Sequence, residues 1–153
     1  MRLSLRFILP LAIVLALLAY GVIPLVDTLT LKWFVRDLDI RSVLIANTME
    51  DALADLITSG SKAKVLAYFH RVLQDERLYA VGFCNTHGRL VHKTLTYPDS
   101  ITCEGPGSVP PNSMVVLPLN QGPVHVASAT IEANGQFLGR LVIVHDMSWV
   151  QRR

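Results

Sequence analysis

The pattern of hydrophobic and polar positions divides the chain into one uninterrupted apolar segment and a longer periodic part. Residues 7–26 (FILPLAIVLALLAYGVIPLV) contain no charged side chain. A helix of that length is about 30 Å long, the thickness of the hydrocarbon core of a bilayer. Arg2 and Arg6 precede the segment, and Asp27 follows it. The positive-inside rule therefore predicts a transmembrane helix, with residues 1–6 in the cytoplasm and the rest of the chain outside.

A cleaved signal peptide is the alternative, because it also begins with positive charge and an apolar core. The apolar segment here is longer than the usual core of about 7–15 residues, and no small-x-small cleavage site follows it. Pro10 and Pro24 lie near the two ends, where a spanning helix tolerates proline. The pattern thus favours an uncleaved anchor.

Residues 27–60 follow a helical period and predict a membrane-proximal helix, continuous with the transmembrane one. Its apolar positions recur at steps of three and four, with one gap at Arg41: Leu31, Phe34, Leu38, Ile45, Met49, Ala52 and Leu56. The helix should end at the Thr58-Ser59-Gly60 breaker. This stripe could form a coiled coil, but its shortness and its gap favour packing on its own domain.

The pattern beyond Gly60 predicts an α+β domain over residues 61–146. Ser61 is a good N-cap for a second helix, residues 62–76. Five strands are expected at residues 78–85, 89–94, 114–119, 124–132 and 137–146. Gly88 and the Asn134-Gly135 pair mark tight turns. Because the connections leave no room for crossover helices, the sheet should be antiparallel.

A long loop and two cysteines qualify this picture. Residues 97–112 contain four prolines and two glycines, so regular structure is not expected there. Cys103 lies in this loop and Cys84 in the first strand. We predict a disulfide between Cys84 and Cys103, which is consistent with an oxidising compartment. Two unpaired thiols or a metal-binding pair are the alternatives to this disulfide, but zinc usually takes four ligands at tighter spacing.

The charge and the motifs exclude several functions. The net charge is +2, and without Arg2 and Arg6 the outer part has 12 basic and 12 acidic residues. No basic patch suits nucleic acid, so we expect no nucleic-acid partner. The sequence contains no Gly-rich phosphate loop, no G-x-S-x-G, no H-E-x-x-H and no Cys-x-x-Cys. We therefore expect neither an enzyme nor a cofactor in this segment, and no catalytic residue.

The histidines admit two interpretations. His92, His125 and His145 fall on expected strands, which could bring them together as metal ligands. Hydrogen-bonded or solvent-facing rings explain them as well, and we expect no metal site. His145 and Asp146 should point to opposite faces of the last strand, which favours a cap or turn role for Asp146.

The strand–turn–strand LYAVGFCNTHGRLVHKT (78–94) and the closing hairpin strand NGQFLGRLVIVHDMS (134–148) resemble the single Cache, or PAS-like, extracytoplasmic sensor domain. The segments 1–48 and VHDMSWVQRR (144–153) look more narrowly like the N-terminal sensor region of some membrane-attached bacterial trehalose-6-phosphate synthases. In such receptors the closing strand leads through a second span into a HAMP-type linker. The resemblance thus implies that residues 147–153 are an exit segment toward a span beyond Arg153, where any glycosyltransferase chemistry would lie.

The resemblance also implies a small-ligand pocket between the sheet and the long loop. Its candidate residues, which offer aromatic faces and hydrogen-bonding groups, are Tyr79, His92, Tyr97, His125 and Arg140. Core packing of the tyrosines and a surface position for Arg140 are the alternative.

Together these observations predict a sensor module of the bacterial inner membrane, with a cytoplasmic N-terminus and a periplasmic Cache/PAS-like domain. We expect a homodimer that binds a small molecule or an envelope protein. A structural anchor and dimerisation domain without a ligand is the alternative function.

Overall fold

The computed structural model describes residues 2–75 and 78–148 and has an α+β fold. Helix α1 (Arg2–Thr58) and helix α2 (Lys62–Asp75) precede the strands. The chain divides into two compact units, Met1–Arg36 and Asp37–Arg153. The order of elements is the one that the hydrophobic pattern predicts, and the exit segment after Ser148 lies outside the described residues.

The first unit is helical. Of the helices in the described part of the chain, α1 is the one long and apolar enough to cross a membrane, and it lies near the N-terminus. Its large apolar side chains are exposed, as Leu17 illustrates at 67%. Such a surface is unfavourable in water but not in hydrocarbon, so α1 is a candidate membrane span.

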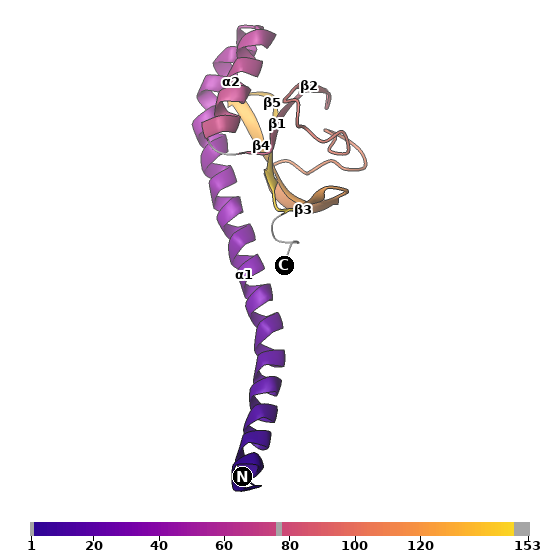
Figure 1. Cartoon of the computed structure of the whole chain (residues 1–153). Helices are drawn as coiled ribbons and strands as arrows, with labels where there is room; N and C mark the ends of the chain where they lie inside the picture. Colours follow the sequence, from indigo (N-terminus) through magenta and orange to yellow (C-terminus); the bar gives the residue numbers. More distant parts are fainter. Residues whose placement is uncertain (1, 76–77, 149–153) are drawn as a thin grey trace. The chain divides into compact units, whose positions relative to one another are not determined.

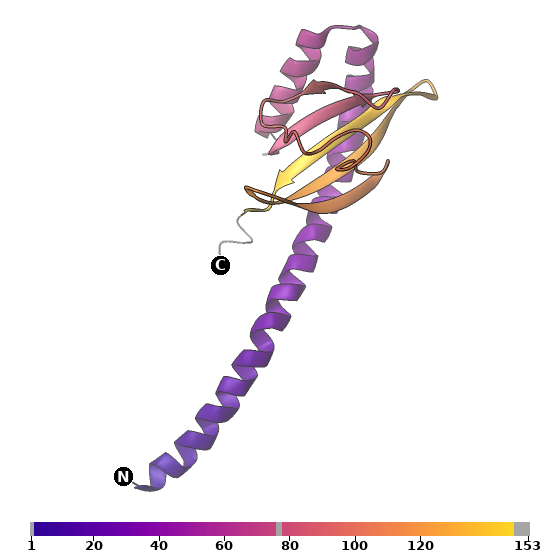
Figure 2. The same ribbon diagram turned by 90° about the vertical axis from the view of Figure 1, so that its right-hand side faces the viewer.

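The second unit contains a single five-stranded antiparallel sheet (Figure 2). Its spatial order is β2-β1-β5-β4-β3, so the last strand in sequence lies at the centre. The strands are β1 (Ala80–Asn85), β2 (Leu90–Lys93), β3 (Ser113–Leu119), β4 (Gly122–Ala133) and β5 (Gln136–Asp146). The long β4–β5 hairpin turns at Asn134 and Gly135, with φ of 53° and 75°, as a two-residue Asn-Gly turn requires.

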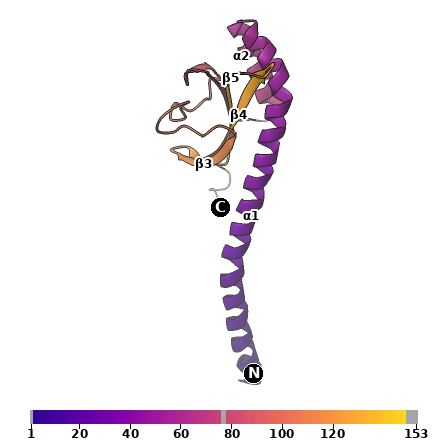
Figure 3. The same ribbon diagram turned by 180° about the vertical axis from the view of Figure 1, so that it is seen from behind.

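The sheet separates two cores, because successive strand residues point to opposite faces. Helix α2 and the α1 segment from Asp37 cover one face, and the loop between β2 and β3 covers the other (Figures 1 and 3). Phe69 and Leu141 are fully buried on the helix side, and Val126 and Val144 are fully buried on the loop side. Cys84 and Cys103 form a disulfide that ties the loop to β1, as the sequence predicts.

The buried stripe of α1 differs from the predicted one at several positions, and Leu31 of the predicted stripe is exposed. Leu38, Ile45 and Met49 are buried as expected, but Ala52 is exposed and Leu53 is fully buried instead. Ser42, which is 1% exposed, lies on the buried face at the point where the predicted apolar stripe is interrupted near Arg41. The steps 38–42–45–49–53 keep one face of the helix on the sheet, so a polar side chain is carried into the interface by helical geometry.

Candidate functional site

A polar cluster lies where α1 crosses β4 and β5. His125 and His145 are directly paired across the two strands, and their ring centroids are 5.8 Å apart. Asp39 Oδ1 accepts a hydrogen bond from His125 Nε2 at 2.7 Å. Ser42 Oγ lies 3.1 Å from His145 Nε2. Positions 39 and 42 are neighbours on one helix face, so two helix residues meet two strand residues in register.

The cluster is buried, and this burial governs its electrostatics. His125 is fully buried and His145 is 7% exposed, whereas the Asp39 side chain is 38% exposed. Burial, followed by the nearby charges of His125 and Arg41, lowers the pKa of His145 to about 4. Arg41 also pairs with Asp37 at 2.8 Å along the exposed side of the helix. A neutral His145 ring is therefore the form that this interface favours near neutral pH.

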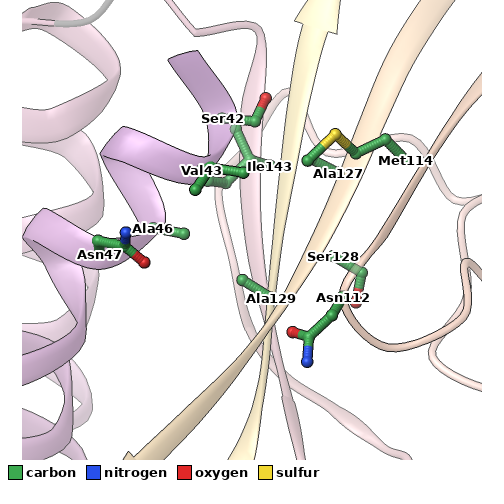
Figure 4. Close-up of a pocket in the computed structure, with 10 residues that line it drawn as sticks. All are labelled: Ser42, Val43, Ala46, Asn47, Asn112, Met114, Ala127, Ser128, Ala129 and Ile143. Carbon is green, nitrogen blue, oxygen red and sulfur yellow. The ribbon is translucent and has the colours of Figure 1, made fainter. Parts of the chain in front are cut away.

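A cavity of about 200 Å³ adjoins the cluster, between α1 and the sheet (Figure 4). Its walls are mostly apolar, with a few hydroxyl and amide groups: Ser42, Val43, Ala46, Asn47, Asn112, Met114, Ala127, Ser128, Ala129 and Ile143. Ala46 on the helix and Ala127 and Ala129 on β4 carry only methyl groups, so the two layers leave space between them. The volume lies below the range of about 300–1,000 Å³ typical of larger ligands, and suits a small one.

Two amides give the cavity hydrogen-bonding capacity. Asn47 lies on α1 (Figure 4). Asn112 is the residue before β3, and its φ is 51°. Asn112 Oδ1 accepts hydrogen bonds from the backbone N–H of Thr130 at 2.9 Å and from its hydroxyl at 3.1 Å. The Asn112 amide is thereby held in place, and its NH₂ group is a further donor beside the cavity.

The arrangement does not favour hydrolytic catalysis. In a Ser-His-Asp triad one imidazole contacts both the serine and the carboxylate. Here Asp39 contacts His125, whereas Ser42 contacts His145. Ser42 also lies within a continuous helix, where the neighbouring backbone N–H groups are used in helical hydrogen bonds rather than for an oxyanion. The geometry instead suits binding and conformational coupling.

The structure does not bring the five candidate ligand residues together around one pocket. Tyr79 and Tyr97 border a polar hollow of about 490 Å³ on the loop side. His125 lies in the helix interface, and His92 lies 6.4 Å from the ring of Phe83 in the helix-side core. The two-residue period of strands places these histidines on the face opposite the loop.

The tyrosines and His92 have local roles. The Tyr79 hydroxyl donates to Gln121 Oε1 at 2.8 Å. Tyr97 is 4% exposed, its ring lies against Gly82, and burial raises its pKa to about 12. Burial, followed by the charge of Lys62, lowers the pKa of His92. Tyr97 thus belongs to the loop-side core, as the alternative interpretation holds.

Arg140 lies on the central strand β5 and holds the long loop. Its guanidinium donates hydrogen bonds to the carbonyl of Val109 at 3.1 Å and to the carbonyl of Cys103. Both carbonyls belong to the segment that the disulfide ties to β1. Arg140 therefore holds the loop against the central strand, and its guanidinium is engaged in these two hydrogen bonds.

We predict that Arg140→Ala lowers the free energy of unfolding by about 2 kcal/mol, because it removes charge-assisted hydrogen bonds and leaves two carbonyls unpaired. Urea unfolding of the full chain in detergent micelles, followed by near-UV circular dichroism, measures the change. Arg71→Ala, at an exposed site on α2, serves as the control and should leave the midpoint unchanged. Equal midpoints for the two variants would contradict this role for Arg140.

Sequence reasoning missed Asp39, Ser42, Asn47 and Asn112 as site residues. The signal for Ser42 was present, since it is a polar residue at the correct helical step where the apolar stripe is interrupted. Asn112 gives no such signal, because its position depends on the path of the preceding loop.

Comparisons of this chain with models of known protein families and with curated proteins find no match.

Proposed function

We propose that this chain is a membrane-anchored extracytoplasmic sensor module, and that a small uncharged molecule in the helix–sheet cavity is its input. The resemblance to Cache/PAS-like sensor regions supports this role. So do the candidate span in α1 and the disulfide, which is typical of oxidising compartments. The same resemblance supports placement in the bacterial inner membrane, within a larger receptor or a sensor-regulated trehalose-6-phosphate synthase.

One observation carries the proposal, namely that the cavity lies between α1 and the sheet rather than inside either layer. A ligand there contacts Val43 and Asn47 on the helix and Met114 on β3 at the same time. Its binding free energy therefore depends on how the segment Asp37–Thr58 is seated on the sheet. A ligand shifts a conformational equilibrium only by such differential affinity.

The helix that forms one wall of the cavity is the helix that contains the apolar segment. A change in the seating of residues 37–58 is thus a change in the element that we propose to cross the membrane. Helix α1 runs without a break from Arg2 to Thr58. A continuous helix is required if a change at the cavity is to be transmitted along α1 to the apolar segment.

Methionine methyl resonances test the site directly. Met114 lines the cavity, whereas Met147 is buried elsewhere in the same unit and serves as an internal control. We expect that fragment-sized uncharged molecules, added to the chain labelled with ¹³C-methyl methionine in nanodiscs, shift the Met114 signal and leave the Met147 signal unchanged. A ligand at a hundred times its dissociation constant should add about 2.7 kcal/mol of stability.

A matched pair of variants locates the binding. Ala129→Leu should fill the cavity and abolish the Met114 shift, whereas Ala133→Leu adds the same volume on the same strand outside the cavity and should preserve it. A library in which no compound shifts Met114, or in which both variants respond alike, would contradict the proposal.

The second candidate function is an anchor and dimerisation domain without a ligand. It is supported by apolar side chains on the outer side of α1, where Ile40 is 62% and Leu44 is 65% exposed. Exposed apolar surface on a helix is typical of an interaction site. A dimer that dissociates in Leu44→Glu while no ligand reaches Met114 would favour this function over sensing.

A further inference from the structure

The buried histidine pair offers a second input to the same helix. We propose that His125 and His145 form a proton-operated latch, which holds α1 against the sheet while the rings are not both charged and releases it when both are protonated. This inference extends the proposed sensor role, but it concerns protons and does not depend on a ligand in the cavity.

The contacts explain why the latch would hold. Each ring reaches α1 through Nε2, His125 to the Asp39 carboxylate at 2.7 Å and His145 to the Ser42 hydroxyl at 3.1 Å. Hydrogen bonds between buried partners become costly to leave unmade, so the four groups stabilise one seating of the helix. The rings are therefore a polar connection between α1 and the two strands.

The charges explain why the latch would open. Two protonated rings with centroids 5.8 Å apart are like charges at a buried interface, and only one of them contacts a carboxylate. His125 Nδ1 is also buried and has no hydrogen-bond partner among the described residues, so a second proton there would be a donor without an acceptor. Moving α1 away would admit water to both rings.

The other charged groups around the pair do not offset this repulsion. On α1, Arg41 adds positive charge, and Asp37 is already paired with it. On β5, the Asp146 carboxylate accepts hydrogen bonds from the backbone N–H and the hydroxyl of Ser148. On the β3 side, the residue paired with His125 is the apolar Val116. Asp39 is thus the carboxylate in contact with the pair, and it faces one ring only.

Ser42 connects the latch to the cavity. Its hydroxyl contacts His145, and the residue lines the cavity wall. A proton on His145 makes Nε2 a donor, so the Ser42 hydroxyl must then accept. Protonation and cavity occupancy therefore act on one helix turn, and the two inputs should be linked reciprocally.

Hydrogen exchange of the full chain in nanodiscs, without ligand, tests the latch. After correction for the intrinsic rate, amides of residues 38–49 should exchange at least about tenfold faster at pH 4 than at pH 7, and at pH 4 they should exchange faster than the amides of Val142 and Val144 in the central strand. His145→Gln, which keeps a group able to hydrogen-bond Ser42, should abolish the difference. His87→Gln, at an exposed turn residue, should retain it.

Two results would overturn the latch. One is an exchange rate at pH 4 that is the same for the helix and the central strand, because the helix would then open only when the whole unit unfolds. The other is a full acid response in His145→Gln. Should that variant fail to fold, the wild-type comparison of residues 38–49 with Val142 and Val144 still decides. A failure of ligand binding at Met114 would leave these results unaffected.

Discussion

Acidification from pH 7 to pH 4 should lower the free energy of unfolding of the second unit (Asp37–Arg153) by about 2–3 kcal/mol through His145 alone. Burial, together with the charges of His125 and Arg41, holds the pKa of His145 at about 4 in the folded protein. In the unfolded chain an exposed histidine titrates near about 6.5. At pH values between the pKa of His145 in the folded protein and its pKa in the unfolded chain, the unfolded state binds more protons than the folded state.

The direction of the effect follows from this difference in bound protons. Stability from the neutral ring is fully present above pH of about 6.5 and is lost progressively as the pH falls toward about 4. Below that pH the folded form is protonated as well, and this contribution no longer changes. Burial and Lys62 also lower the pKa of His92, so this ring contributes with the same sign.

Urea unfolding of the full chain in detergent micelles at a series of pH values measures the slope. His145→Gln should remove most of it, because the variant has no group at this site that titrates in the range. His87→Gln should keep the wild-type slope, because that ring is exposed. An unchanged slope in His145→Gln would show that the acid sensitivity arises elsewhere.

The double substitution Cys84→Ala/Cys103→Ala should cost about 3 kcal/mol of stability. The bridge joins residues 19 apart, and without it the unfolded chain regains the conformational freedom of that loop. The folded state is affected too, because Arg140 holds the carbonyl of Cys103 and depends on the loop remaining beside β5. Both cysteines are buried, so alanine avoids placing an unpaired hydroxyl in the core.

Two measurements check this prediction. The urea midpoint should fall, and a glutamate-specific protease should cleave faster after the exposed Glu104 of the released loop. Reduction of the wild-type protein should reproduce both changes, whereas a reductant should have no further effect on the double variant. An unchanged midpoint together with unchanged cleavage at Glu104 would mean that the loop is held without the bridge.

Some features of this protein follow from local sequence signals. Three such features depend on neighbouring residues alone: the apolar run before Asp27, the helix end before Gly60 and the Asn134-Gly135 turn. The structure has a helix over the apolar run, a helix end at Thr58 and a turn at Asn134-Gly135. Strand number and antiparallel pairing followed as well, because short connections leave few topologies. Even the disulfide could be proposed, since two cysteines permit only one internal pair.

The candidate site could not be predicted in this way. Which face of a strand meets the helices is decided by pairing between distant segments, and a one-residue difference in position reverses the face. The resemblance implies that His92 and His125 lie on the loop side with Tyr97, but in the structure both lie on the helix side. The sequence offers Arg140 as a candidate ligand residue, but the path of the loop places two carbonyls beside its guanidinium.

By itself, the sequence determined the elements of this protein, because hydrophobic period, caps and turn residues act over a few positions. The tertiary structure alone decided that Asp39 and Ser42 meet His125 and His145, residues that lie 86 and 103 positions further along the chain. It also decided that small side chains from α1 and β4 face one another across a cavity. Both outcomes depend on how a helix crosses a sheet, which no local pattern in the chain encodes.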